Sequence, residues 1–197
     1  MFVDLTPYPF VRALEGAWMT IRDEAQALPE GRFLPWLQRE MYGEGWSVVP
    51  LNWLGRTVPG MTDHCPATCA LLADIPGLAM AIFSRLAPRT HIRPHVGWGD
   101  RVHRIHLALK TPRQGAWIRV GHETRAWTAG RCLGFDDTVE HEAANESDEW
   151  RTVLMLDVLR PGLTGAPYDP GKLPHEVAAM AELLVSGEPK TGRRRRE

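Results

Sequence analysis

Two histidines beside apolar segments are the first residues whose type and placement suit chemistry. His95 lies in the motif PHVG, shortly before an apolar segment, and His141 follows the residues FDDTVE. Neutral imidazole binds iron, zinc or copper well, so two histidines at the mouth of a barrel are candidates for a shared metal. The chain has eight histidines, however. From spacing alone, hydrogen-bonded surface histidines remain the simpler interpretation.

Two arginines accompany segments with the pattern of strands. In residues 102–109, alternation with a period of two places Arg104, His106 and Ala108 on one face and isoleucine and leucine on the other. This indicates a polar pocket rather than an apolar core. Arg151 opens a second apolar segment. If buried, it needs an anionic partner because an unpaired buried charge is costly, and its planar fork suits a carboxylate. From the residues alone, an exposed arginine at a strand entrance is favoured.

Two other candidate sites have weaker support. His64, Cys65 and Cys69 are near one another in sequence, but a structural zinc site needs four ligands at recognised spacings, and Cys132 is distant. We expect these cysteines to serve packing. The arginine run 193–196 is compatible with nucleic-acid binding or a localisation signal. A solvated, disordered basic tail over 188–197 is the favoured interpretation.

The elements that must position these residues are short. Five apolar or β-branched segments follow Leu78, separated by Gly, Pro, Asp and Asn turns: 79–86, 102–109, 116–120, 131–135 and 152–158. This pattern predicts an all-β sandwich or closed barrel. Apolar residues at helical spacing predict a helix over 9–28. We further expect a strand over 46–54, a short helix over 68–73 and a C-terminal helix over 173–187.

Length and composition predict one domain over residues 1–190, with an N-terminal helical layer (1–77) on a β-rich core (78–163). The net charge of −1 over 197 residues gives no electrostatic case for nucleic acid or membrane as a partner. No signal-peptide pattern is seen, and no stretch approaches the ~20 apolar residues of a membrane span. Three cysteines fit a reducing compartment. We therefore expect a cytoplasmic protein.

The stretch from Phe83 to Leu163 resembles the aspartyl/asparaginyl β-hydroxylase family of iron(II)/2-oxoglutarate-dependent dioxygenases. The matching segments, in order, are FSRL, PHVG, RIHLAL, GHETRAW, FDDTVEHE and RTVLMLDV, with weaker likeness back through Gly45-Trp46 and PATCALL. The resemblance implies a mainly β fold with flanking helices: a double-stranded β-helix (a jelly-roll, cupin-like core) with an N-terminal helix. This agrees with the short strands predicted above.

The resemblance also implies a metal site. His95 and His141 match the family's iron ligands. Gly97 stands where most iron(II)/2-oxoglutarate enzymes have a carboxylate ligand, and the family shares this glycine. Asp137 matches an aspartate that is placed to orient a water molecule and restore negative charge near the iron. Where the family often continues as GPTN, this chain has GWGD, which leaves Asp100 open to reaching the metal or a substrate cation.

The resemblance further implies the cosubstrate site. Arg151 matches the position that binds the distal carboxylate of 2-oxoglutarate, and Ser84, Arg104 and His106 match positions that contact the same molecule. Trp98, in the divergent motif, is a candidate wall of the pocket.

The activity implied is hydroxylation of an unactivated C–H bond with O2, with release of succinate and CO2. We expect the substrate to be a small molecule or peptide: the β-carbon of an aspartyl or asparaginyl residue, or a free or carrier-bound amino acid. The alternatives are a catalytically silent jelly-roll that senses 2-oxoglutarate or a metal or acts as a scaffold, a cupin-like enzyme without 2-oxoglutarate, an acyl-chain hydroxylase, and a halogenase that uses the vacant ligand position.

Overall fold

The computed structural model describes residues 1–186 and contains two antiparallel sheets that face each other. The larger sheet has the strand order β1-β10-β7-β12-β5-β3-β2, with β4 paired to β3, and the smaller has the order β6-β11-β8-β9. The strands of the larger sheet are β1 (Phe2–Val3), β2 (Leu34–Pro35), β3 (Trp46–Trp53), β4 (Arg56–Thr57), β5 (Leu78–Leu86), β7 (Val102–Lys110), β10 (Cys132–Phe135) and β12 (Arg151–Leu159). Those of the smaller sheet are β6 (Thr90–His95), β8 (Ala116–Val120), β9 (Glu123–Ala126) and β11 (His141–Asn145). This is the expected jelly-roll.

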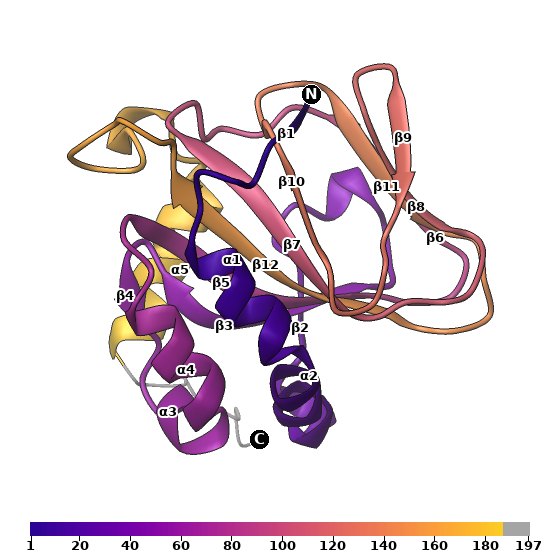
Figure 1. Ribbon diagram of the computed structural model, residues 1–197, viewed down its shortest axis with the longest axis horizontal. Coiled ribbons are helices and arrows are strands. Elements are labelled where there is room, and N and C mark those ends of the chain that lie inside the picture. The colour runs from indigo at the N-terminus through magenta and orange to yellow at the C-terminus, as the bar shows by residue number, and fades with distance from the viewer. Residues whose placement is uncertain (187–197) are drawn as a thin grey trace, which may run out of the picture.

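The helices within residues 10–73 cover the face of the larger sheet that is turned away from the smaller one (Figure 1), whereas the C-terminal helix packs through Val177 on the core between the sheets. The helices and 3-10 turns are α1 (Phe10–Gly16), α2 (Trp18–Ala27), η1 (Glu30–Arg32), η2 (Arg39–Met41), α3 (Met61–His64), α4 (Pro66–Ala73), η3 (Pro170–Lys172) and α5 (His175–Ser186). Among the described residues, none of these helices has the length and apolar character needed to cross a bilayer.

The larger sheet separates two apolar cores because its long strands are apolar on both faces. On β7, Ile105 and Leu107 face the helices, whereas Ala108 faces the smaller sheet. The neighbouring β12 divides in the same way, with Leu154 toward the helices and Met155 toward the smaller sheet. The alternation predicted from sequence for residues 102–109 is therefore confirmed. It also sets which side chains reach the space between the sheets.

Two expectations about the N-terminal part need correction. The single helix predicted over 9–28 is two helices, α1 and α2, which meet at Ala17 directly after Gly16. Glycine is a poor helix former. The strand expected over 46–54 is confirmed as β3, but it pairs along its length with β5 and therefore belongs to the larger sheet and not to a separate layer over 1–77. Its side chains fill both cores, Val48 on one face and Val49 on the other.

The C-terminal prediction is tested up to residue 186. Helix α5 begins at His175, close to the predicted start at 173, and accepts a hydrogen bond at the Val177 carbonyl from Nε1 of Trp53 (3.0 Å). The predicted basic tail, with the run 193–196, lies outside the described residues.

Candidate metal and cosubstrate site

His95 and His141 meet at the edge of the smaller sheet. His95 is the last residue of β6 and His141 the first of β11, and the strand register places them opposite each other, with ring centroids 4.2 Å apart. In each ring Nδ1 donates to a backbone carbonyl: His95 to Arg93 (2.7 Å) and His141 to Val139 (2.9 Å). These hydrogen bonds fix the tautomer and leave a lone pair on each Nε2. The pair can therefore act as two ligands of one metal ion.

Burial keeps these two rings neutral. Loss of solvation, together with the neighbouring His95, lowers the pKa of His141 to about 3. Burial also lowers the pKa of His95. Because a metal binds the unprotonated imidazole, both rings are in their binding form at neutral pH.

The turn between β10 and β11 directs Asp137 inward. The Asp136 side chain accepts hydrogen bonds from the backbone N–H and the hydroxyl of Thr138 (3.0 and 2.7 Å) and from Arg160 (2.6 Å). Aspartate commonly closes a turn by such bonds to the residue two positions on. With Asp136 held outside in this way, Asp137 is fully buried, and burial raises its pKa to about 7.

Asp137 and Gly97 share one small space beside the histidines. A Cβ atom added to Gly97 would lie 1.6 Å from Oδ2 of Asp137, and the Gly97 N–H donates to the Asp137 carbonyl (2.8 Å). Oδ1 of Asp137 is 3.4 Å from Nε2 of His141. The glycine is therefore required by packing, because a larger residue would displace the carboxylate.

A cavity opens from the histidine pair into the space between the two sheets. It encloses ≈ 350 Å³ including its mouth. Its lining comprises Trp46, Ser84, Ile92, His95, Arg104, His106, Ile118, Phe135, His141, Ala143, Arg151 and Met155. Six of the seven site residues predicted from the sequence thus line one cavity, and the seventh, Asp137, contacts His141.

Arg151 lies in this cavity without a carboxylate partner among the described residues. It is 2% exposed, so the favoured interpretation of an exposed arginine at a strand entrance is wrong. Nη1 of Arg151 donates to the Ser84 carbonyl (3.4 Å), and Nε has no acceptor within residues 1–186. The guanidinium lies over the Trp127 ring, 4.5 Å from its centroid. Burial lowers the pKa of Arg151 to about 9.

Ser84 and His106 complete a set of donors near Arg151. Trp46 donates to Oγ of Ser84 (3.0 Å), which leaves the hydroxyl hydrogen available. Trp127 donates to Nδ1 of His106 (3.3 Å), so the proton of the neutral ring is on Nε2. That Nε2 is buried and has no partner in the described part of the chain. Burial and the two nearby arginines lower the pKa of His106 well below its usual value, which keeps the ring neutral.

Arg104 is different because its charge is already balanced. The register of β7 and β12 places Arg104 opposite Asp157. Nε and Nη2 donate to the two oxygens of that carboxylate, both at 2.8 Å, and Nη1 lies 2.6 Å from Oδ1 of Asp137. Two carboxylates therefore hold this guanidinium, which lines the cavity but is not a free cation.

The donors present fit iron(II) and 2-oxoglutarate. Two neutral imidazoles suit a divalent metal. Oδ1 of Asp137 is in the ion pair with Arg104, whereas Oδ2 has no partner among residues 1–186 and remains able to accept from a metal-bound water. Arg151, Ser84 and His106 supply a cation and two donors for a carboxylate. No group of three or more His, Cys, Asp or Glu side chains that could hold a metal ion occurs in the described residues.

Asp100 and Trp98, from the divergent motif GWGD, are not among the residues that line the cavity. Asp100 is half-exposed and its Oδ2 binds Nζ of Lys172 (2.6 Å), so its partner is a cation of the chain and not the metal site. Trp98 stacks on Trp36 with an interplanar angle of 8°, behind the lining of the cavity.

Three further residues that hold or contact the site residues, Asp157, Trp127 and Tyr168, were not identified from the sequence. Asp157 had a usable signal, because the same period-two pattern that describes β7 puts it on the face of β12 that carries Arg151. Trp127 lies in the segment GHETRAW that matches the family, but no role was predicted for it. Tyr168, whose hydroxyl binds Asp157 (2.7 Å), comes from the segment after β12, and no sequence pattern marks it.

Comparison with known proteins agrees with this geometry. A family model described as aspartyl/asparaginyl beta-hydroxylase matches residues 15–161. Human aspartyl/asparaginyl beta-hydroxylase is 35% identical over 162 residues, which cover 78% of this chain and 21% of that protein. The ornithine lipid ester-linked acyl 2-hydroxylase of Rhizobium tropici is 41% identical over 99 residues, 49% of this chain and 35% of that protein. The chain spans about a fifth to a third of the length of these relatives.

Proposed function

Because this chain belongs to the aspartyl/asparaginyl β-hydroxylase family, we propose that it is an iron(II)/2-oxoglutarate-dependent dioxygenase that hydroxylates an unactivated C–H bond. In this proposal His95 and His141 hold Fe(II) through Nε2, and Arg151 is the main ligand of the distal carboxylate of 2-oxoglutarate. When bound, the metal and cosubstrate supply the oxidising chemistry with O2, and succinate and CO2 are released.

The observation that carries this proposal is the uncompensated charge of Arg151. Keeping a buried guanidinium without an anion costs several kcal/mol, so the position is explained by a ligand that brings a carboxylate. Ser84 and His106 direct two more donors into the same cavity. A scaffold, or a cupin-like enzyme that uses no 2-oxoglutarate, has no need for this set of donors.

The chain's own residues orient the reactants and exclude water. Ile92, Ile118 and Phe135 wall the cavity with apolar surface, which strengthens the contact between Arg151 and a bound carboxylate by lowering the local dielectric. Asp137 is placed to accept a hydrogen bond from a water at the position that Gly97 leaves without a ligand. In this proposal Arg104 holds Asp137, and its contact with the cosubstrate is secondary.

For the substrate, we propose the β-carbon of an aspartyl or asparaginyl residue, or of a related free or carrier-bound amino acid. The support is the human relative, which covers most of this chain. A second candidate is an acyl chain, because the Rhizobium relative named as an acyl 2-hydroxylase is more similar over the segment that it matches. All three cysteines are free thiols, in keeping with the cytoplasmic location that we propose.

Two measurements test this function. Anaerobic protein with Fe(II) and 2-oxoglutarate should develop a weak visible charge-transfer absorption that needs both additions. Succinate release should then be screened against aspartyl and asparaginyl peptides, amino acids and acyl lipids, with mass spectrometry for a product heavier by one oxygen atom. Cosubstrate binding without succinate from any class would favour a sensor. Iron binding without 2-oxoglutarate binding would refute the proposal, and a halogenated product would indicate the alternative chemistry.

A further inference from the structure

A chain of buried polar contacts links the segment after β12 to the metal site. Tyr168 donates from its hydroxyl to Oδ2 of Asp157 (2.7 Å), and Asp157 accepts both Nε and Nη2 of Arg104 (2.8 Å each). Arg104 in turn contacts Asp137, whose Oδ1 lies 3.4 Å from Nε2 of His141. All five residues are buried. The contacts therefore form one continuous path that ends at the histidine pair.

Each contact in this path restricts the next. A guanidinium is planar and its donors have fixed directions, so when Nε and Nη2 are held by Asp157, the direction of Nη1 toward Asp137 is also set. Asp157 can accept both hydrogen bonds from Arg104 only while its carboxylate keeps one orientation. The Tyr168 hydroxyl supplies the remaining contact. Burial and Asp157 raise the pKa of Tyr168 well above its usual value, so the hydroxyl remains a donor.

Tyr168 lies outside the segment that matches the family model, which ends at residue 161. Its ring is nevertheless 7% exposed and packs with Ala79 and Val102, and a Cβ atom on Gly99 would be 3.3 Å from the ring. The backbone of Gly99 belongs to the loop that follows His95 and Gly97. Tyr168 thus contacts the metal-site loop directly as well as through Asp157.

We propose that Tyr168 and Asp157 are positioning residues of the metal site, acting through Arg104 to set where the Asp137 carboxylate lies beside the histidines. The inference rests on the proposed function, because it takes His95 and His141 as the metal ligands. Partners that hold the groups around a metal typically change metal affinity or activity by 10- to 100-fold when they are lost. A smaller effect is expected for one hydroxyl at the start of this path.

Tyr168→Phe is the sharpest test because it removes one hydroxyl and keeps the ring. Tyr8→Phe is its control: Tyr8 is also a buried tyrosine, and its hydroxyl bonds Nδ1 of His103 (2.7 Å), the residue before Arg104, in a part-buried contact on the other face of β7. Each variant loses one hydrogen bond of a tyrosine hydroxyl, and melting temperatures show how much stability each loses.

The readout is binding of Co(II) alone, followed by titration and by its ligand-field absorption spectrum. We expect Tyr168→Phe to weaken Co(II) binding about threefold to tenfold and to shift the spectrum. Asp157→Asn should have a larger effect in the same direction, about tenfold or more. Tyr8→Phe should match the wild type in both measurements. If Asp157→Asn does not fold, Tyr168→Phe decides the question.

The outcomes separate this inference from the proposed function. If wild type binds Co(II), His141→Ala does not, and Tyr168→Phe behaves as Tyr8→Phe does, then the positioning role is refuted and the metal site stands. If wild type fails to bind Co(II), or His141→Ala binds it as well as wild type does, both proposals are overturned.

Discussion

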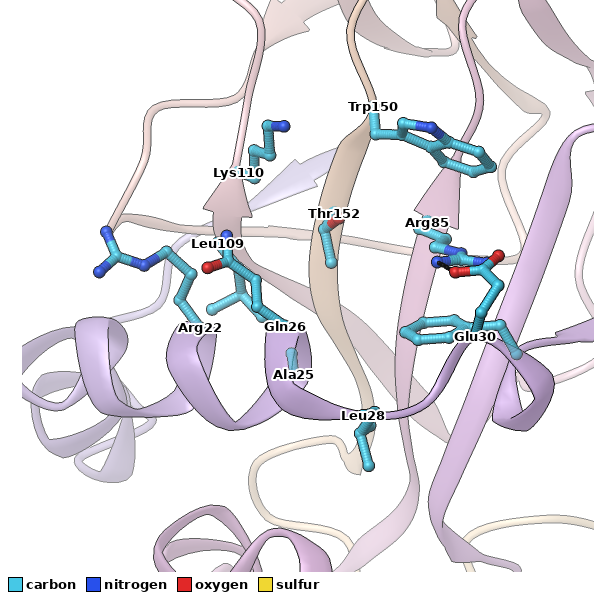
Figure 2. A pocket seen from close by; sticks show the side chains of 11 residues that line it. Arg22, Ala25, Gln26, Leu28, Glu30, Arg85, Leu109, Lys110, Trp150 and Thr152 are labelled. Atoms are coloured by element: carbon cyan, nitrogen blue, oxygen red, sulfur yellow. Dashed lines mark hydrogen bonds and ion pairs between the residues drawn. The ribbon is translucent and has the colours of Figure 1, made fainter.

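Two arginines on neighbouring strands, Arg85 of β5 and Arg151 of β12, point to opposite faces of the larger sheet and have opposite charge environments. Arg85 lines an outer groove of ≈ 1070 Å³ between the sheet and α2, where it forms an ion pair with Glu30 (Figure 2). Its guanidinium lies 3.6 Å from the ring centroid of Phe33 and 4.7 Å from that of Trp150. Arg151 lies in the inner cavity, with Trp127 beside it and no carboxylate from residues 1–186.

We infer from this difference that the candidate ligand site is indicated by a buried cation without a partner, and not by the size of a cavity. The outer groove is larger than the inner cavity, but the charge of its partly buried Arg85 is already compensated by Glu30. The inner cavity leaves one guanidinium and one imidazole N–H without partners. Unpaired buried polar groups are costly. Their retention in one small space is explained by a bound anion.

The largest expected effect concerns the histidines on the two faces of β6. His95→Ala removes the metal ligand on the inner face of β6 and should reduce Co(II) or Fe(II) affinity about 100-fold or more, measured by anaerobic titration. His91→Ala is the matched control, because His91 also lies on β6 but is half-exposed and bonds Oε2 of Glu142 (2.7 Å). Equal losses of affinity in both variants would remove the distinction between the faces.

Next in size is the effect on cosubstrate binding. Arg151→Ala should weaken 2-oxoglutarate binding by roughly 2–3 kcal/mol, about 30- to 150-fold, because it removes the buried cation that pairs with the carboxylate. Metal affinity should remain within about twofold. Arg85→Ala, the same change on the other face of the sheet, should leave both affinities unaltered. Calorimetry with 2-oxoglutarate in the presence of Co(II) measures this, and an unaffected Arg151→Ala variant would refute the pocket assignment.

Gly97, beside Asp137, and Gly31, in the turn that bears Glu30, differ in the space around them. Gly97→Ala places a methyl group against Asp137 and should lower the free energy of unfolding by about 1–3 kcal/mol as an overpacked site, with weaker metal binding. Gly31→Ala, in the turn that bears Glu30, meets no atom within 4 Å and serves as the control. Thermal unfolding and Co(II) titration test the pair. A fully stable Gly97→Ala variant with normal metal affinity would contradict the packing described here.

The smallest effect is the pH dependence of the metal-free protein. Burial lowers the pKa of His141 to about 3 and also lowers those of His95 and His106. Below pH 6.5 the unfolded chain therefore binds protons that the folded chain does not, and stability falls as the pH decreases. For His141 we expect a loss of about 1 kcal/mol per pH unit between pH 6.5 and 5, and His95 and His106 act in the same direction.

Asp137 acts in the opposite sense within the same window. Its pKa, raised to about 7 by burial, means that the folded chain holds a proton that the unfolded chain has released, so this group alone favours folding as the pH falls from 7 toward 4. Asp137→Asn should consequently steepen the loss of stability on acidification. Melting temperatures at pH 7.5 and 5.5 test both statements, and a flat profile for the wild type would contradict them.

The strands that could be predicted are those whose own residues favour a strand. β5, β7, β8, β10 and β12 are rich in apolar and β-branched residues and were expected within one or two residues of their bounds. No strand was expected at β6 or β11, which carry the two histidines. β11 has the sequence HEAAN and β6 contains Pro94, residues that seldom favour strands. Their conformation comes from pairing with each other and with β8.

The chemical groups of the site can be read from the sequence alone: two imidazoles in recognisable motifs, a glycine where an acid is usual, and arginines in the predicted strands. Which arginine lacks a carboxylate partner depends on the packing of the folded chain. Strand register sets Arg104 opposite Asp157, whereas it sets Arg151 opposite Leu86. Register depends on contacts between residues about 50 to 70 positions apart, and the free energy of a buried charge depends on what lies beside it in space. The residues next to each arginine in the sequence do not show which side chain will lie beside it in the folded chain.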